Sequence, residues 1–207
     1  MARSGGSRRW LDEHFNDPYV REAQRRGLRS RAAFKLEEID RRDRLLAPGQ
    51  CVVDLGASPG GWSEYAMHRV GQSGRVVAID LLEMTPPPGV SFVQGDFGAD
   101  EGLAALDEAL SNCPVDLVLS DMAPNFSGHK AIDQPRAMRL AELALDFCED
   151  RLKPGGGLLV KVLQGQGFDD LLAAMRQRFD RVQSRKPPAS RGRSREVYLL
   201  ARGFRAV

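Results

Sequence analysis

The chain has 207 residues, of which 42% are hydrophobic and 28% are charged. That length and composition fit one globular domain with a short appendage, and they exclude a chain that is disordered as a whole. The formal net charge is +2, and no apolar run approaches the roughly 20 residues of a membrane span, so we expect no membrane association.

The predicted elements begin with two helices and then alternate between strand and helix. We expect helices over residues 18–26, 30–45, 62–70, 101–110, 136–151 and 168–179, and strands over 51–55, 75–81, 91–94, 115–120, 158–163, 181–184 and 196–201. This alternation predicts an α/β fold with a mostly parallel seven-stranded sheet and helices on both faces. The last two strands have no helix between them and predict an antiparallel edge hairpin. We divide the chain into a basic N-terminal extension, residues 1–29, and a single domain, residues 30–207.

The small net charge conceals an uneven distribution. Residues 1–36 have a net charge of +5, residues 37–175 have −11, and residues 176–207 have +8. Arginine supplies 25 of the 30 basic residues, and its guanidinium group suits bidentate phosphate contacts. Two basic ends around an acidic body indicate a polyanionic partner.

The cysteines and histidines indicate the compartment and argue against a metal site. Cys51, Cys113 and Cys148 are odd in number and form no C-x-x-C pair, and the three histidines are scattered. The first 14 residues also lack the apolar stretch of a secretory signal. We therefore expect a reducing, cytoplasmic compartment, no disulfide scaffold and no bound metal.

Glycines and acidic residues follow the ends of the predicted strands. The turn after the first strand has the spacing G-x-x-x-G-G rather than the G-x-G-x-x-G of dinucleotide-binding proteins. Carboxylates at consecutive strand ends suit a ligand with a ribose and a positive charge, because ligands of open α/β sheets bind at that edge. S-adenosylmethionine fits this description and NAD does not. The residues that we assign to the cofactor are Asp54, Gly56, Gly60, Trp62, Asp80, Asp96, Phe97 and Asp121.

Lys161 stands out because it lies among aliphatic residues of the fifth strand, where a buried ammonium group needs a partner. A position at the edge of the sheet would also explain it, with the ammonium group reaching solvent. Lys35 and Glu196, taken alone, are ordinary surface residues.

The ordered motifs resemble those of one family. Residues 54–62, 94–97 and 120–125, together with Lys161, are similar to the RrmJ/FtsJ ribose 2′-O-methyltransferases. Residues 9–20 and 29–36 resemble the members that act on large-subunit ribosomal RNA, so the similarity covers nearly the whole chain. Residues 86–88 have no clear counterpart.

The resemblance implies a Rossmann-like fold, with residues 30–207 as the methyltransferase domain, and a catalytic tetrad of Lys35, Asp121, Lys161 and Glu196. It also implies that a monomer methylates the ribose 2′-hydroxyl of a uridine in 23S-type ribosomal RNA, within the large subunit. Lys161 would accept the hydroxyl proton or orient the hydroxyl, and the basic ends would contact phosphates.

Other readings remain open at this point. One alternative is a 2′-O-methyltransferase of the same family whose substrate is tRNA or an mRNA cap. A non-catalytic RNA-binding factor in ribosome assembly would keep the fold without the activity. The motif Asp-Met-Ala-Pro after the fourth strand argues against amino-group methylation, for which Asn/Asp-Pro-Pro-Tyr is typical.

Overall fold

The computed structural model describes residues 17–192 and 194–206. Residues 1–16, which include Trp10 and most of the expected extension, lie outside the described residues, as do residues 193 and 207.

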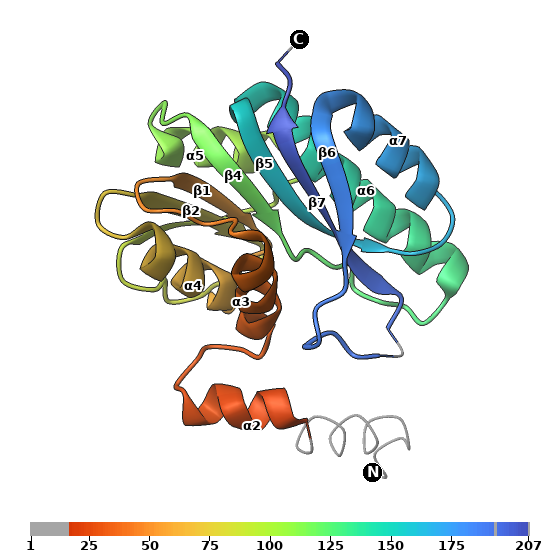
Figure 1. The fold of residues 1–207 in the computed structure, drawn as a ribbon, viewed down its shortest axis with the longest axis horizontal. Coiled ribbons are helices and arrows are strands. Elements are labelled where there is room, and N and C mark those ends of the chain that lie inside the picture. The colour runs from red at the N-terminus through yellow and green to blue at the C-terminus, as the bar shows by residue number, and fades with distance from the viewer. Residues whose placement is uncertain (1–16, 193, 207) are drawn as a thin grey trace.

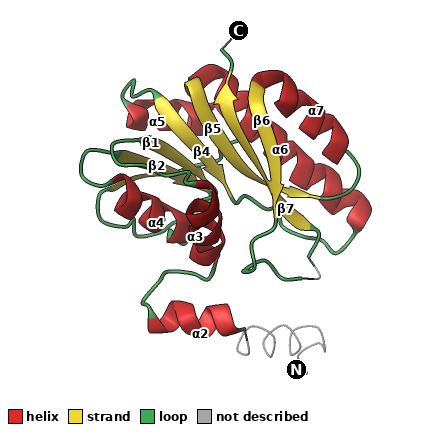
Figure 2. Cartoon of the chain, viewed as in Figure 1, coloured by secondary structure: helices red, strands yellow, loops and turns green. Residues whose placement is uncertain are grey.

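The elements follow the predicted order (Figures 1 and 2). The helices are α2 (Pro18–Arg25), α3 (Ala32–Asp43), α4 (Gly61–Val70), α5 (Asp100–Leu110), α6 (Lys130–Arg151) and α7 (Phe168–Arg178). The strands are β1 (Cys51–Leu55), β2 (Arg75–Asp80), β3 (Val90–Gln94), β4 (Val115–Ser120), β5 (Leu152–Leu163), β6 (Phe179–Arg185) and β7 (Glu196–Phe204).

The seven strands form one sheet in the order β3-β2-β1-β4-β5-β7-β6. The strands β1 to β5 pair in parallel, whereas β7 runs antiparallel to both β5 and β6. The predicted antiparallel hairpin is therefore confirmed, with β6 as the edge strand and β7 inserted beside β5.

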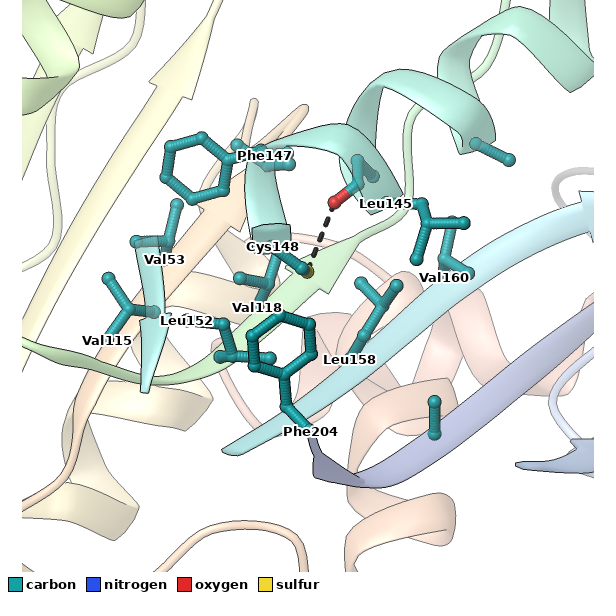
Figure 3. Packing of buried hydrophobic residues seen from close by; sticks show 14 of the residues in the cluster. Val53, Val115, Val118, Leu145, Phe147, Cys148, Leu152, Leu158, Val160 and Phe204 are labelled. Atoms are coloured by element: carbon teal, nitrogen blue, oxygen red, sulfur yellow. Dashed lines mark hydrogen bonds between the residues drawn. The ribbon is translucent and has the colours of Figure 1, made fainter. Parts of the chain in front are cut away.

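Alternate residues of the strands pack on opposite faces of the sheet, as the period of a strand requires. Val53 and Leu55 of β1 face the core under α5, α6 and α7, while Val52 faces the core under α3 and α4. Figure 3 shows Phe147 and Cys148 of α6 packed against the first of these cores. Helices thus cover both faces, and each core is built from aliphatic and aromatic side chains.

Two elements begin six residues earlier than the sequence predicts. The helix expected from residue 136 starts at Lys130, with Pro135 inside it. Pro135 lies beyond the first turn, so its missing N–H removes one intrahelical hydrogen bond; the helix start is held by Asp133, which accepts hydrogen bonds from the backbone of Ser127 and Gly128. The strand expected from residue 158 starts at Leu152 and pairs with Val115 of β4 before a register shift.

The start of α2 follows from local chemistry. The Asp17 side chain accepts a hydrogen bond from the backbone N–H of Tyr19 and caps the helix, while Pro18 takes the first helical position, where no N–H is needed.

Across the described residues, no helix has the length and apolar character needed to cross a membrane. Cys51, Cys113 and Cys148 are free thiols.

Candidate active site

The sheet order brings most of the predicted site residues together at the carboxyl ends of the parallel strands. Asp80, Asp54 and Asp121 lie in or directly after β2, β1 and β4, which are neighbours in the sheet. Lys161 lies near the carboxyl end of β5, next to β4. Because β7 runs antiparallel to β5, its first residue, Glu196, pairs with the last residue of β5. The reversed strand therefore places Glu196 at the carboxyl ends of the others.

Asp121 is the main partner of Lys161. The Lys161 Nζ lies 3.1 Å from Asp121 Oδ1 and donates a hydrogen bond to the Asp121 backbone oxygen at 2.6 Å. The Lys161 side chain is only 9% exposed, and β5 is an interior strand. The alternative of an edge lysine that reaches solvent is therefore wrong. The cost of burying the Lys161 ammonium group is offset by its contacts with two oxygen atoms of Asp121.

Lys35 joins this pair from α3. Its Nζ lies 3.8 Å from Asp121 Oδ1 and 4.0 Å from Glu196 Oε2. The helix is fixed on the sheet by Leu36 and Ile39, which are buried in the core under α3 and α4. The four predicted tetrad residues thus come from four elements of the chain and meet in one cluster of two ammonium groups and two carboxylates.

Tyr198 belongs to the same cluster and was not predicted from the sequence. It pairs with Lys161 across β5 and β7, and its hydroxyl donates to Asp121 Oδ1 at 2.7 Å. The Lys35 Nζ lies 5.6 Å from the centre of the Tyr198 ring. The signal was available, because Tyr198 lies two residues after Glu196 and alternate residues of a strand share a face.

The electrostatics of the cluster keep Asp121 ionised. Burial opposes its charge, but the positive charges of Lys161 and Lys35 and the hydrogen bond from Tyr198 outweigh burial and hold the Asp121 pKa below its ordinary value. Burial and the charge of Asp121 raise the pKa of Tyr198 well above its ordinary value. The tyrosine therefore donates as a neutral hydroxyl at physiological pH.

The glycine-rich turn lies beside this cluster, where β1 ends. Gly56 has φ +77°, and a Cβ there would lie 2.6 Å from Met122 Cγ and 3.1 Å from Met122 Cα. Only glycine allows the β1 turn to approach the segment after β4 this closely.

The loop without a family counterpart packs on the same turn. Gly60 has φ +99°, and a Cβ there would lie 3.2–3.3 Å from Arg29 Cδ, Met84 Sδ and Pro87 Cγ. Arg29 also donates to the Thr85 backbone oxygen at 2.5 Å. Arg29 and the residues around Pro87 therefore border the turn, a contact that sequence reasoning did not find.

Asp80 and Asp96 both have backbone partners. Asp80 accepts hydrogen bonds from the N–H groups of Ser58 and Leu82, both at 2.8 Å. Asp96 accepts one from the Gly98 N–H at 2.8 Å. These bonds hold the two strand-end turns in shape, and they leave acceptor capacity on each carboxylate.

Asp54 is the most unusual acid of the site. It is completely buried in β1, its Oδ2 accepts a hydrogen bond from Ser63 at 2.5 Å, and its Oδ1 has no partner. Burial raises the Asp54 pKa to about 7. The hydrogen bond from Ser63 opposes this effect, and the negative charges of Asp121 and Asp80 add to it. A completely buried carboxylate oxygen without a donor is a group that a cationic or hydrogen-bonding ligand would satisfy.

The two aromatic residues assigned to the cofactor are placed in the cores. Trp62 is 3% exposed, packs on Tyr198 with ring centres 5.7 Å apart, and donates its indole N–H to the Ala32 backbone oxygen. Phe97 is 6% exposed and packs edge-on against Phe147. The structure therefore does not bring the Phe97 ring together with the tetrad.

The residues present fit a cationic adenosine-containing cofactor. The unpaired Oδ1 of Asp54 and the close glycine turn are the features that such a group would use, and Leu81 and Leu82 expose apolar surface beside Asp80. Within the described residues, no three His, Cys, Asp or Glu side chains are grouped to hold a metal ion.

Comparisons with known proteins show the family of the chain. The sequence model of the family described as FtsJ-like methyltransferase matches residues 28–204. The ribosomal RNA large subunit methyltransferase E of Pseudomonas aeruginosa is 59% identical over 205 residues, which are 99% of each chain. The protein of the same name from Stenotrophomonas maltophilia is 58% identical over 99% of this chain and 98% of the relative.

Solved structures give the same fold. A crystal structure from Plasmodium falciparum, assigned as a ribosomal RNA methyltransferase, superposes with a TM-score of 0.77 at 30% identity, covering 86% of this chain and 100% of that one. The resemblance of the motifs and the expected Rossmann-like fold are both confirmed. The chain belongs to the FtsJ-like methyltransferase family.

Proposed function

We propose that this protein transfers a methyl group from S-adenosylmethionine to the ribose 2′-hydroxyl of a uridine in large-subunit ribosomal RNA. The observation that carries the proposal is the cluster of Lys35, Asp121, Lys161 and Glu196 at the strand ends, beside a glycine-rich turn. The names of the curated relatives support ribosomal RNA as the substrate.

The carboxylates at the strand ends would hold the cofactor. We assign the ribose hydroxyls to Asp80, the adenine amino group to Asp96, and the positive end to Asp54 and Asp121. Gly56 and Gly60 would shape the turn that borders the cofactor by letting it pack closely on Met122 and on Pro87, and Trp62 and Phe97 would support the turns from the core. When bound, the cofactor supplies a methyl group on a cationic sulfur, so the protein's main task is alignment.

The residues of the tetrad would act on the hydroxyl. Lys161, held by Asp121, would contact the 2′-oxygen: as an ammonium it orients the hydroxyl for attack, and it accepts the hydroxyl proton only in its neutral amine form, after its own proton has left to water. Lys35 and Glu196 form the opposite side of the cluster and position the sugar. The hydroxyl oxygen would take the methyl group that the cationic sulfur supplies, leaving the sulfur neutral, and the hydroxyl proton would leave to water or to a neutral Lys161.

The charge distribution supports an RNA partner. The acidic body holds the carboxylates at the strand ends, and the two basic ends lie at the termini of the sequence. Figure 1 shows α2 and the loop between β6 and β7 at the same end of the molecule. We propose that a single copy of the chain acts, in the cytoplasm, with the basic extension before residue 30 contacting RNA phosphates.

The deciding experiment measures transfer of labelled methyl groups by the purified protein. Large ribosomal subunits, naked ribosomal RNA, tRNA and capped mRNA from cells lacking the protein serve as acceptors. Label on a uridine 2′-oxygen of the ribosomal RNA supports the proposal. Label only on tRNA or on the cap overturns the substrate assignment, and RNA binding without any transfer overturns the enzymatic one.

A further inference from the structure

Two segments that are far apart in the sequence meet on α3. These are α2 and the residues between β6 and β7 that the structure describes, 186–192 and 194–195, called here the β6–β7 loop (Figure 1). Ala23 of α2, Phe34 of α3 and Ala189 of the loop form a small buried apolar cluster, against which Tyr19 and Leu28 pack. The contact therefore has an apolar centre and is not only an encounter of surface charges.

Arg31 joins the two segments at the start of α3. Its Nη1 lies 3.2 Å from Asp17 Oδ2, at the cap of α2. Its Nη2 donates to the backbone oxygen of Ala189 in the loop. Its guanidinium carbon lies 5.8 Å from the centre of the Tyr19 ring.

Glu38 makes the same connection further along α3. Its Oε1 accepts a hydrogen bond from the Tyr19 hydroxyl at 2.9 Å, and its Oε2 accepts one from the Ala189 N–H at 2.8 Å. Burial and the bond to Glu38 raise the pKa of Tyr19, so the hydroxyl keeps its proton. We call Asp17, Tyr19, Arg31, Glu38 and Ala189 the α3 junction.

Two residues of the α3 junction, Arg31 and Glu38, lie on either side of the tetrad residue Lys35 along α3. Arg31, Lys35 and Glu38 have the spacing i, i+4, i+7, which places them on one face of a helix. The β6–β7 loop also ends at Glu196, 4.0 Å from Lys35. At its start, Arg185 forms a bidentate ion pair with Asp43 at the end of α3. The helix that presents Lys35 therefore also fixes both ends of the loop.

Both segments that meet at the junction expose cationic side chains. Arg21 and Arg25 of α2 are exposed, as are Lys186 and Arg195 of the loop. RNA affinity depends on such cations, because phosphate contacts release counterions.

We propose that α2 and the β6–β7 loop form one continuous binding surface for an RNA phosphate backbone, and that Glu38 is a positioning residue that holds this surface in register with Lys35. The inference rests on the proposed action on RNA. If only net charge mattered, removing the acidic side chain of Glu38 from a basic surface would strengthen RNA binding. A positioning role for Glu38 predicts that its removal weakens RNA binding.

The test measures the dissociation constant of a short fluorescent single-stranded RNA at several salt concentrations. Glu38→Ala breaks both hydrogen bonds and is expected to weaken binding roughly tenfold, the size of one or two net hydrogen bonds. The salt dependence is expected to become shallower as phosphate contacts are lost. Unchanged or tighter binding overturns the proposal.

Three further variants test whether the loss of RNA binding comes from the hydrogen bonds of the α3 junction or from a change in charge or folding. Glu38→Gln keeps both contacts, since its amide oxygen accepts from Ala189 and its amide N–H donates to the Tyr19 oxygen, so near-normal binding is expected. Binding as weak as that of Glu38→Ala overturns the role of these bonds.

Tyr19→Phe keeps every charge and is expected to weaken RNA binding severalfold. Normal RNA binding by this variant contradicts the proposal. Glu142→Ala on α6, an exposed acid, controls for charge and is expected not to weaken binding.

Two readouts show where the effect acts. The dissociation constant of S-adenosylmethionine is expected to stay unchanged in Glu38→Ala, and in the transfer assay the variant is expected to raise KM for RNA more than it lowers kcat. A loss confined to kcat overturns the positioning role. The binding test needs no methyl transfer, so an inactive wild-type protein refutes the proposed function and leaves this result readable.

Discussion

Lys161 and Tyr198 lie opposite each other on β5 and β7, and both bind Oδ1 of Asp121, at 3.1 Å and 2.7 Å. One carboxylate oxygen thus joins two strands to the segment after β4. Asp121 also retains Lys35 as a more distant partner. Each partner can therefore be removed singly without leaving the buried carboxylate uncompensated.

Lys161 is expected to be needed for the chemical step. Lys161→Ala should lower kcat by about 10²–10⁴-fold, the usual contribution of a positioned proton-transfer group. The cofactor's dissociation constant should change little, because Lys35 and Tyr198 still hold Asp121. Single-turnover methyl transfer and calorimetry measure the two effects.

Lys161→Arg separates the two roles of the lysine. Arginine still donates hydrogen bonds but does not lose a proton in proteins, so partial activity indicates orientation and none indicates proton acceptance. Lys153→Ala, at the exposed start of the same strand, is the control. Wild-type rates in Lys161→Ala would refute both roles.

Tyr198→Phe is expected to change the pH dependence of activity. The hydroxyl hydrogen bond contributes to the lowered pKa of Asp121. Without it the Asp121 pKa rises, so activity on the acid side should be lost at a higher pH than in the wild-type protein. The pH profile of kcat/KM measures this shift.

Tyr65→Phe is the matched control for Tyr198. Its hydroxyl donates to Asp40 at 2.9 Å, away from the tetrad. This variant should lose stability without moving the pH profile. An equal shift in both variants would show that the effect is not specific to Asp121.

Asp54→Asn is expected to stabilise the fold at high pH and to weaken cofactor binding. The folded-state pKa of about 7 lies above the ordinary value of 3.8, so between these values the folded protein binds more protons than the unfolded chain. Wild-type stability therefore falls as pH rises through this window. The Tm advantage of Asp54→Asn should be larger at pH 8 than at pH 5.

Cofactor affinity gives the second half of the Asp54 prediction. A cationic group is held by the ionised carboxylate, so wild-type affinity for S-adenosylmethionine should rise with pH up to about 7 and then level off. In Asp54→Asn the affinity should be lower and lack this rise. Calorimetry at several pH values measures it, and identical pH profiles would exclude Asp54 from the cofactor site.

Gly56→Ala is expected to be severely destabilising. The backbone conformation alone costs an alanine about 1–2 kcal/mol, and the new Cβ would lie 2.6 Å from Met122 Cγ and 3.1 Å from Met122 Cα. Gly155→Ala, at φ +81° with open space around it, isolates the backbone cost. Chemical denaturation should show a loss for Gly56→Ala well above that of Gly155→Ala, and equal losses would contradict the close approach.

The sequence alone was informative wherever the signal is local. Helix starts such as Asp17-Pro18, the alternation of strands and helices, and the acids at strand ends depend on neighbouring residues, and the fold class follows from their order. The expected starts were wrong for α6, which begins at Lys130 and not at residue 136, and for β5, which begins at Leu152 and not at residue 158. The tetrad was named from a family resemblance rather than from spacing.

The tertiary structure alone decided which side chains meet. The register of β5 against β7 puts Tyr198 beside Lys161, and a slip of one residue would turn Tyr198 to the other face. Packing also decided that the Phe97 ring lies against Phe147 in the core. In the same way, only the folded chain brings Ala189 within hydrogen-bond distance of Glu38, 151 residues away in sequence. Such contacts depend on long-range packing, which leaves no periodic signal in the sequence.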